Sequence, residues 1–99
     1  MEKMPMLCTL PEGTLAERRL AIQALLKSRT AVIRHPDGVE LQWTFSEETA
    51  RSLLEFVLFE RMCCKTFTYE LSFPPPHDRV VLRMRAPIEQ VEALQAFYC

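Results

Sequence analysis

Apolar and polar positions in the region of residues 31–45 follow the pattern of two β-strands joined by a tight turn. Residues 31–35 are a short run with two β-branched side chains, and residues 39–45 alternate strictly between apolar and polar side chains. Between them, Pro36-Asp37-Gly38 is typical of a turn, because proline sets one dihedral angle and Gly38 is free to adopt a positive φ. The pattern predicts a β-hairpin.

A second hairpin is predicted by the same alternation further along the chain. Residues 67–73 place aromatic or apolar side chains at every second position, and residues 80–85 alternate Val80, Leu82 and Met84 with Val81, Arg83 and Arg85. The proline-rich segment 74–79 joins the two runs as a turn. We expect the alternating aromatic side chains of both hairpins to point into the core, and Arg83 and Arg85 to lie on the opposite, solvated face of the sheet.

Each hairpin is preceded by a predicted helix. Thr14 and Glu17 form a capping box that begins the first helix, which we expect to end at residue 28 or 29. Residues 1–13, with Pro5, Pro11 and Gly13, form an irregular N-terminal arm.

The second helix is expected to begin after Ser46, a favourable N-cap residue, and to end at Cys63 or Cys64. Its predicted apolar stripe, with Glu60 on its margin, comprises Ala50, Leu53, Leu54, Val57, Leu58, Arg61 and Cys64. Phe56, Phe59 and Cys63 lie on a flank outside this stripe. A helix that covers only a sheet does not need two apolar faces, so the pattern predicts a second contact surface.

A final helix follows Pro87, which suits the first turn of a helix. The predicted order is therefore αββαββα, an α+β fold in which a four-stranded antiparallel sheet of two hairpins packs against helices. The 99 residues are enough for a single domain, residues 1–99, with one core.

Composition and charge argue against two classes of partner. The chain has 12 basic and 13 acidic residues, for a formal net charge of −1, so it offers no basic field to attract nucleic acid or a membrane surface. It has no apolar run long enough to span a membrane and no apolar segment typical of a signal peptide. We therefore expect a cytoplasmic protein whose four cysteines are kept reduced.

The residues that could carry chemistry are concentrated at the end of the second helix. Glu60 lies three residues before Cys63 and four before Cys64, so either pair can share one face of a helix. Thiolates select zinc, copper(I) or mercury, and Cys8 in the N-terminal arm could supply a third sulfur. This spacing predicts a site for a thiophilic metal ion formed by Cys8, Glu60, Cys63 and Cys64.

An equally simple interpretation is that these cysteines are small buried side chains of the core. Adjacent helical residues diverge by about 100°, so Cys63 and Cys64 could share an ion only where the helix unwinds. A catalytic thiol would need a nearby base, and His35 and His77 lie in turns of separate hairpins, where exposed side chains are typical. An enzyme is thus less favoured than a binding protein, and Cys99 at the end of the chain is expected to be exposed.

Three short motifs resemble those of a group of small bacterial proteins, and the resemblance spans nearly the whole chain. The motifs are Cys8-Thr9-Leu10, Pro36-Asp37-Gly38 and Glu60-Arg61-x-Cys63-Cys64-x-x-Phe67. Members of the group look like companions of heavy-metal-responsive regulators, which implies a thiol or metal role for Cys8, Glu60, Arg61, Cys63 and Cys64. The chain departs from the group's pattern where Lys65 replaces a proline and where Ala86 replaces a glycine.

Two hypotheses follow from the sequence. The first is a cytoplasmic protein that binds a soft metal ion, or senses redox state, through Cys63 and Cys64 with Cys8. The alternative is a non-catalytic module for protein interaction or homodimerisation, in which the cysteines only fill the core and the second apolar face of the helix is the contact surface.

Overall fold

The computed structural model describes residues 12–99, without the side chains of residues 12–16, 18 and 63. Its helices and strands follow one another as α1 (Glu12–Lys27), β1 (Ala31–His35), β2 (Gly38–Thr44), α2 (Glu47–Cys63), β3 (Thr68–Ser72), β4 (Arg79–Arg85) and α3 (Ile88–Tyr98). The predicted α+β fold and the αββαββα order are confirmed. The first helix begins at Glu12, two residues before the predicted cap at Thr14.

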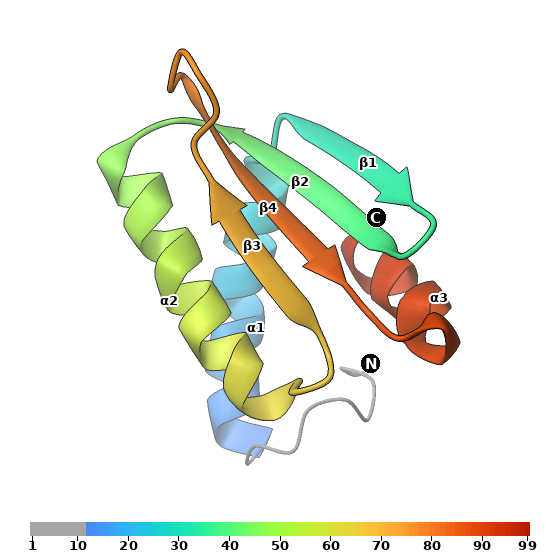
Figure 1. Cartoon of the computed structure of the whole chain (residues 1–99). Coiled ribbons are helices and arrows are strands. Elements are labelled where there is room, and N and C mark those ends of the chain that lie inside the picture. The colour runs from blue at the N-terminus through green and yellow to red at the C-terminus, as the bar shows by residue number, and fades with distance from the viewer. Residues whose placement is uncertain (1–11) are drawn as a thin grey trace.

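The four strands form one antiparallel sheet in the order β1-β2-β4-β3 (Figure 1). Each hairpin pairs its own two strands, and the hairpins join through β2 and β4, with Leu41 opposite Leu82 at the centre. Gly38 of β2 lies opposite Arg85, and a side chain there would collide with the backbone carbonyl of Met84. Gly38 does not have the positive φ expected from the turn motif. This glycine is needed for close backbone approach instead.

The helices cover one face of the sheet, and the core lies between the two layers (Figure 1). Alternate residues of the central strands point into this core, together with residues from all three helices: Ile22, Val39, Leu41, Trp43, Leu53, Phe56, Val80, Leu82, Met84, Leu94 and Tyr98. The other face presents polar side chains, with Glu40, Arg83 and Glu70 side by side in one row across the strands. Within β2, β3 and β4, the alternation in the sequence therefore predicted both faces of the sheet correctly.

The helix α2 begins as predicted, with the backbone amide of Thr49 donating to the Ser46 hydroxyl. Its buried side differs from the predicted stripe, because Leu54 and Leu58 are 50% and 45% exposed. The buried line consists of Leu53, Phe56, Glu60 and Cys64, with Val57 partly buried. Phe56, predicted on a separate flank, packs edge-to-face on Tyr98 of α3 with ring centroids 6.1 Å apart. Phe56 thus belongs to the buried side of α2, and Glu60, four residues further on, lies on the same side.

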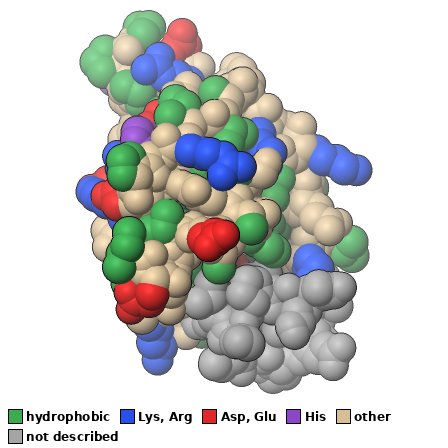
Figure 2. Space-filling model, turned by 90° about the vertical axis from the view of Figure 1, so that its right-hand side faces the viewer, with side chains coloured by type: hydrophobic (Ala, Val, Ile, Leu, Met, Phe, Trp, Pro, Cys, Tyr) green, Lys and Arg blue, Asp and Glu red, His purple; other side chains and the backbone are tan. Residues whose placement is uncertain are grey.

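Two aromatic residues expected in the core are exposed instead. Phe45 follows the end of β2 and Phe73 follows the end of β3, and their rings pack edge-to-face on each other 6.0 Å apart. Beyond them, the β3–β4 loop projects at the top of the molecule (Figure 2). The alternation continues past the strands in the sequence, but the cover of the helix layer does not.

None of the helices within residues 12–99 has the length and apolarity that a membrane crossing requires.

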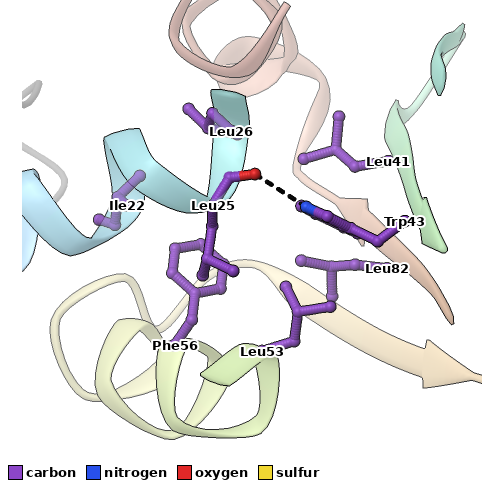
Figure 3. Close-up of a pocket in the computed structure, with 8 residues that line it drawn as sticks. All are labelled: Ile22, Leu25, Leu26, Leu41, Trp43, Leu53, Phe56 and Leu82. Atoms are coloured by element: carbon purple, nitrogen blue, oxygen red, sulfur yellow. Dashed lines mark hydrogen bonds between the residues drawn. The ribbon is translucent and has the colours of Figure 1, made fainter. Parts of the chain in front are cut away.

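Trp43 attaches the end of α1 to the sheet. Its indole Nε1 donates to the backbone oxygen of Leu25 over 2.8 Å, as Figure 3 shows. That oxygen lies in the last turn of α1, where backbone carbonyls lack partners within the helix, and it also accepts from Ser28. The space left among the surrounding apolar side chains is about 10 Å³. A space of that size holds at most one water molecule, so this part of the core is not a ligand site.

Candidate functional site

The candidate site is built on the last turn of α2, where Glu60 and Cys64 lie one above the other. The backbone amide of Cys64 donates to the carbonyl of Glu60 over 2.7 Å, which closes the turn. The Cys64 thiol donates to Glu60 Oε1, with Sγ and the oxygen 3.5 Å apart. Only 1% of Glu60 and 4% of Cys64 is exposed. The predicted contact between residues four apart on the helix is therefore present, and it lies inside the protein.

The helix ends between the two adjacent cysteines. Cys63 is the last residue of α2, and Cys64 is its C-cap, with φ −118° and ψ 73° outside the helical range. The carbonyl of Cys64 accepts from the amide of Phe67 over 3.4 Å, which turns the chain toward β3. The unwinding that a shared ion would require thus occurs at this pair of residues.

Two tyrosines from other elements complete the polar cluster. Tyr69 lies on the inner face of β3, opposite Met84, and its hydroxyl oxygen is shielded from solvent. Tyr98, the last residue of α3, is buried, and both tyrosines interact electrostatically with Glu60 and Cys64. Glu60, Cys64, Tyr69 and Tyr98, which we call the buried cluster, therefore come from three different elements.

The surroundings of Cys64, Tyr69 and Tyr98 favour the neutral forms of these side chains. Burial, and then the neighbouring Glu60 carboxylate, raise the pKa of Cys64 to about 12. Burial also raises the pKa of Tyr69 and of Tyr98, and negative charge nearby adds to the effect. The Cys64 thiol is thus protonated at neutral pH, which makes it a poor nucleophile.

The structure places the other predicted ligands less completely. Cys8 lies outside the described residues, and Cys63 is described only through its backbone at the end of α2. Arg61, implied by the resemblance, is exposed on the same helix, and Cys99 is exposed as expected. Within residues 12–99, no group of three or more His, Cys, Asp or Glu side chains is arranged to hold a metal ion. The described chain therefore brings two of the four predicted ligands together, Glu60 and Cys64.

The histidines differ from each other. His77 is exposed in the β3–β4 loop, as predicted. His35, also expected to be exposed, is half-buried, with Nε2 3.0 Å from Glu40 Oε1. Burial alone would raise the pKa of Glu40, but hydrogen bonds from Gln42 and His35 lower it. His35 is engaged by this contact, because β1 and β2 pair and bring it beside Glu40.

A second group of ionisable side chains surrounds the β1–β2 turn. Arg83 Nη2 donates to Asp37 Oδ1 over 2.8 Å, and Arg85 donates to both carboxylate oxygens of Glu70, over 3.2 and 2.6 Å. The hydrogen bond from Arg83 is the main reason that the pKa of Asp37 is lowered. We call these four residues the turn network. In it, the guanidinium groups of Arg83 and Arg85 on the open sheet face pair with the carboxylates of Asp37 and Glu70.

The tyrosines were the residues that sequence reasoning missed. Alternation did place Tyr69 on the inner face of its strand, beside a helix end that carries Glu60 and Cys64. The position of Tyr98 depends on how α3 packs, which no local pattern indicates. Comparison with protein-family models, with curated proteins and with solved structures gave no match to this chain.

Proposed function

We propose that this protein binds one thiophilic metal ion at the end of α2. Glu60 and Cys64 are the two ligands that the fold holds together, and Cys63 and Cys8 are the further ligands. The observation that carries the proposal is the 3.5 Å separation of Cys64 Sγ and Glu60 Oε1 inside the protein.

The separation of these two atoms, which now share a hydrogen bond, is also compatible with both binding one ion. Zinc binds a thiolate at about 2.3 Å and a carboxylate oxygen at about 2.1 Å, and a tetrahedral angle between them puts the two ligand atoms about 3.6 Å apart. The observed distance between sulfur and oxygen therefore needs almost no change when the thiol proton is replaced by the ion.

The ligand types narrow the choice of ion. Thiolates favour zinc, copper(I) and mercury(II), and a carboxylate in the same set favours zinc among them. The thiols would have to stay reduced, which the cytoplasm ensures, and we propose that compartment as the site of action. A redox or nucleophilic role for Cys64 is less favoured, because its raised pKa keeps it protonated.

Native mass spectrometry of the reduced protein with zinc, copper(I) or mercury(II) tests the proposal. We expect one bound ion per chain, lost in Cys64→Ser and in Glu60→Gln and kept in Cys99→Ser, which removes an exposed thiol. Cys63→Ser and Cys8→Ser show whether these residues complete the ligand set. Binding that is absent in the wild type, or that survives both Cys64→Ser and Glu60→Gln, would contradict the proposal.

Self-association through α2 is a second candidate function. Leu54, Leu58 and Met62 lie four residues apart on one side of the helix and are 50%, 45% and 51% exposed. An antiparallel second copy would set Leu54 against Met62 of the second copy, with Leu58 on the two-fold axis, because the three are evenly spaced. Among the side chains that Figure 2 colours by type, the hydrophobic ones are interspersed with charged ones.

Size-exclusion chromatography with light scattering tests this second candidate. We expect a dimer that becomes a monomer in Leu58→Asp, while Leu20→Asp, at a position 70% exposed on α1, leaves it unchanged. A wild-type protein that stays monomeric at high concentration would exclude the dimer. Because this surface and the buried cluster use different sides of α2, either proposal can fail without the other.

A further inference from the structure

A hollow of about 250 Å³ lies between α1 and α2 and contains none of the proposed metal ligands. Ile22, Leu25 and Phe56 line its apolar side, and Figure 3 shows that the first two come from α1 and the third from α2. Ile22 and Phe56 are buried, whereas Ala24 and Glu55, which also line the hollow, are exposed, so it is open to solvent. Its volume is just below the range of pockets for drug-sized ligands, which begins at about 300 Å³.

The polar side chains of the hollow lie together on α2. Ser52 and Glu55 are three residues apart, so they share one side of the helix. Glu55 is the one charged residue among those that line the hollow, and within residues 12–99 its carboxylate forms no ion pair. Glu47, two turns earlier on the same helix, is paired with Arg51. The hollow therefore combines an apolar floor with a carboxylate that has no cation of the described chain beside it.

We propose that this hollow binds a small organic cation, in which an ammonium group is carried on a compact apolar body. The ammonium group donates hydrogen bonds to the Glu55 carboxylate and the Ser52 hydroxyl, and the bond to the carboxylate is strengthened by charge. The apolar body covers Ile22, Leu25 and Phe56 and displaces water from them, which favours binding. A neutral molecule lacks the first contribution, and an anion is repelled by Glu55.

The extent of the hollow favours a small molecule over a protein partner. Seven residues of the described chain line it. A stable interface between proteins uses about 20–30 residues on each side, so this hollow alone is too small for one. Pockets for small ligands, in contrast, are mostly apolar and have a few polar groups that fix the orientation of the ligand, as here.

Trp43 provides a reporter that does not itself line the hollow. It is the one tryptophan of the chain, and its indole Nε1 donates to the backbone oxygen of Leu25 over 2.8 Å. Because the side chain of Leu25 lines the hollow, a ligand that contacts it should change the NMR signal of the indole N–H.

An NMR titration of the whole protein with cyclohexylmethylammonium tests the proposal. We expect saturable shifts in the amide signals of Ala24, Ser52 and Glu55 and in the indole signal of Trp43, at a concentration of about 1 mM, because so small a ligand reaches only modest affinity. Cyclohexylmethanol, which has the same body without the charge, should bind about two- to fivefold more weakly, the range of an exposed ion pair. Cyclohexanecarboxylate should not bind.

Two variants separate the charge from the cavity. Glu55→Gln should weaken binding of the cation about two- to fivefold and leave binding of the alcohol unchanged. Ala24→Phe, which fills the hollow from an exposed position, should abolish binding of both. Glu92→Gln, at an exposed position on α3, is the matched control and should change neither.

The comparison of the cation with the alcohol needs no variant, so it decides the proposal even if Ala24→Phe does not fold. Equal affinity of the wild type for the two molecules would overturn the proposal, as would unchanged binding of the cation in Glu55→Gln. Absence of saturable shifts in the wild type would overturn it as well.

Discussion

The buried cluster and the turn network each contain an acidic group beside other ionisable side chains, yet the pKa values of these two acids shift in opposite directions. In the turn network, Asp37 is open to solvent beside Arg83, and its pKa is lowered. In the buried cluster, Cys64 lies beside another acid and away from water, and its pKa is raised to about 12. In the turn network, guanidinium groups hold the acid in its ionised form, whereas in the buried cluster burial holds the thiol in its neutral form.

This difference separates structural charges from candidate functional ones. Ion pairs near the surface contribute little to stability, because water and salt screen them. Acidic groups that lie together away from solvent are costly to ionise, and such groups are common at functional sites. Four predictions test this distinction, and they are given from the largest expected effect to the smallest.

Gly38→Ala should have the largest effect, although it changes no charge. The new Cβ would collide with the backbone of Met84 and approach Arg85, and neither can move without distorting the centre of the sheet. We expect a loss of about 3 kcal/mol or more in the free energy of unfolding, measured by chemical denaturation. A near-wild-type value would mean that the pairing of β2 with β4 is looser than described, and the turn network would then owe its geometry to its charges.

Glu60→Ala should be next, and Glu70→Ala is its matched partner in the turn network. Glu60 is 1% exposed and accepts from the Cys64 thiol, so truncation leaves a cavity and removes a hydrogen-bond acceptor. We expect a loss of about 2 kcal/mol for Glu60→Ala, against less than about 1 kcal/mol for Glu70→Ala. Equal losses in the two variants would erase the contrast between the two groups.

Alkaline pH should reveal the buried thiol. Since the pKa of Cys64 is raised from 9.0 to about 12, the folded protein keeps a proton that the unfolded chain releases, and stability is lost as pH rises through this window. We expect the wild type to lose about 1 kcal/mol more than Cys64→Ala between pH 7 and pH 10, in parallel denaturation curves. Identical pH profiles would show that the thiol is not held in its protonated form.

Asp37→Asn should have the smallest effect of the four. The side chain keeps its shape and loses its charge, and the pair with Arg83 is screened by solvent. We expect a denaturation midpoint close to that of the wild type, with the remaining difference disappearing in high salt. A large loss of stability that does not depend on salt would mean that Asp37 acts like a buried group, and the contrast between the turn network and the buried cluster would fail.

Much of the fold could be predicted from local signals. Strict alternation identified the strands and their two faces, and Ser46 marked the start of α2, because both depend on neighbouring residues alone. Spacing by four likewise brought Glu60 and Cys64 together, since such residues meet on any helix.

The remainder depends on contacts between elements that are distant in the chain. The packing of α2 on other elements decides that Phe56 is buried and that Leu54 and Leu58 are exposed, and no period within α2 indicates this choice. Phe45 fits the alternation but lies beyond the edge of the helix layer. For the same reason Tyr69 and Tyr98 were missed as members of the buried cluster.

The metal site at the end of α2 is tested most directly by X-ray absorption spectroscopy of the zinc-loaded protein. We expect a sulfur ligand at about 2.3 Å and an oxygen or nitrogen ligand at about 2.0–2.2 Å in the wild type, with one fewer sulfur in Cys64→Ser. A zinc environment that contains no sulfur, or that is the same in the wild type and Cys64→Ser, would contradict the assignment of Cys64 as a ligand.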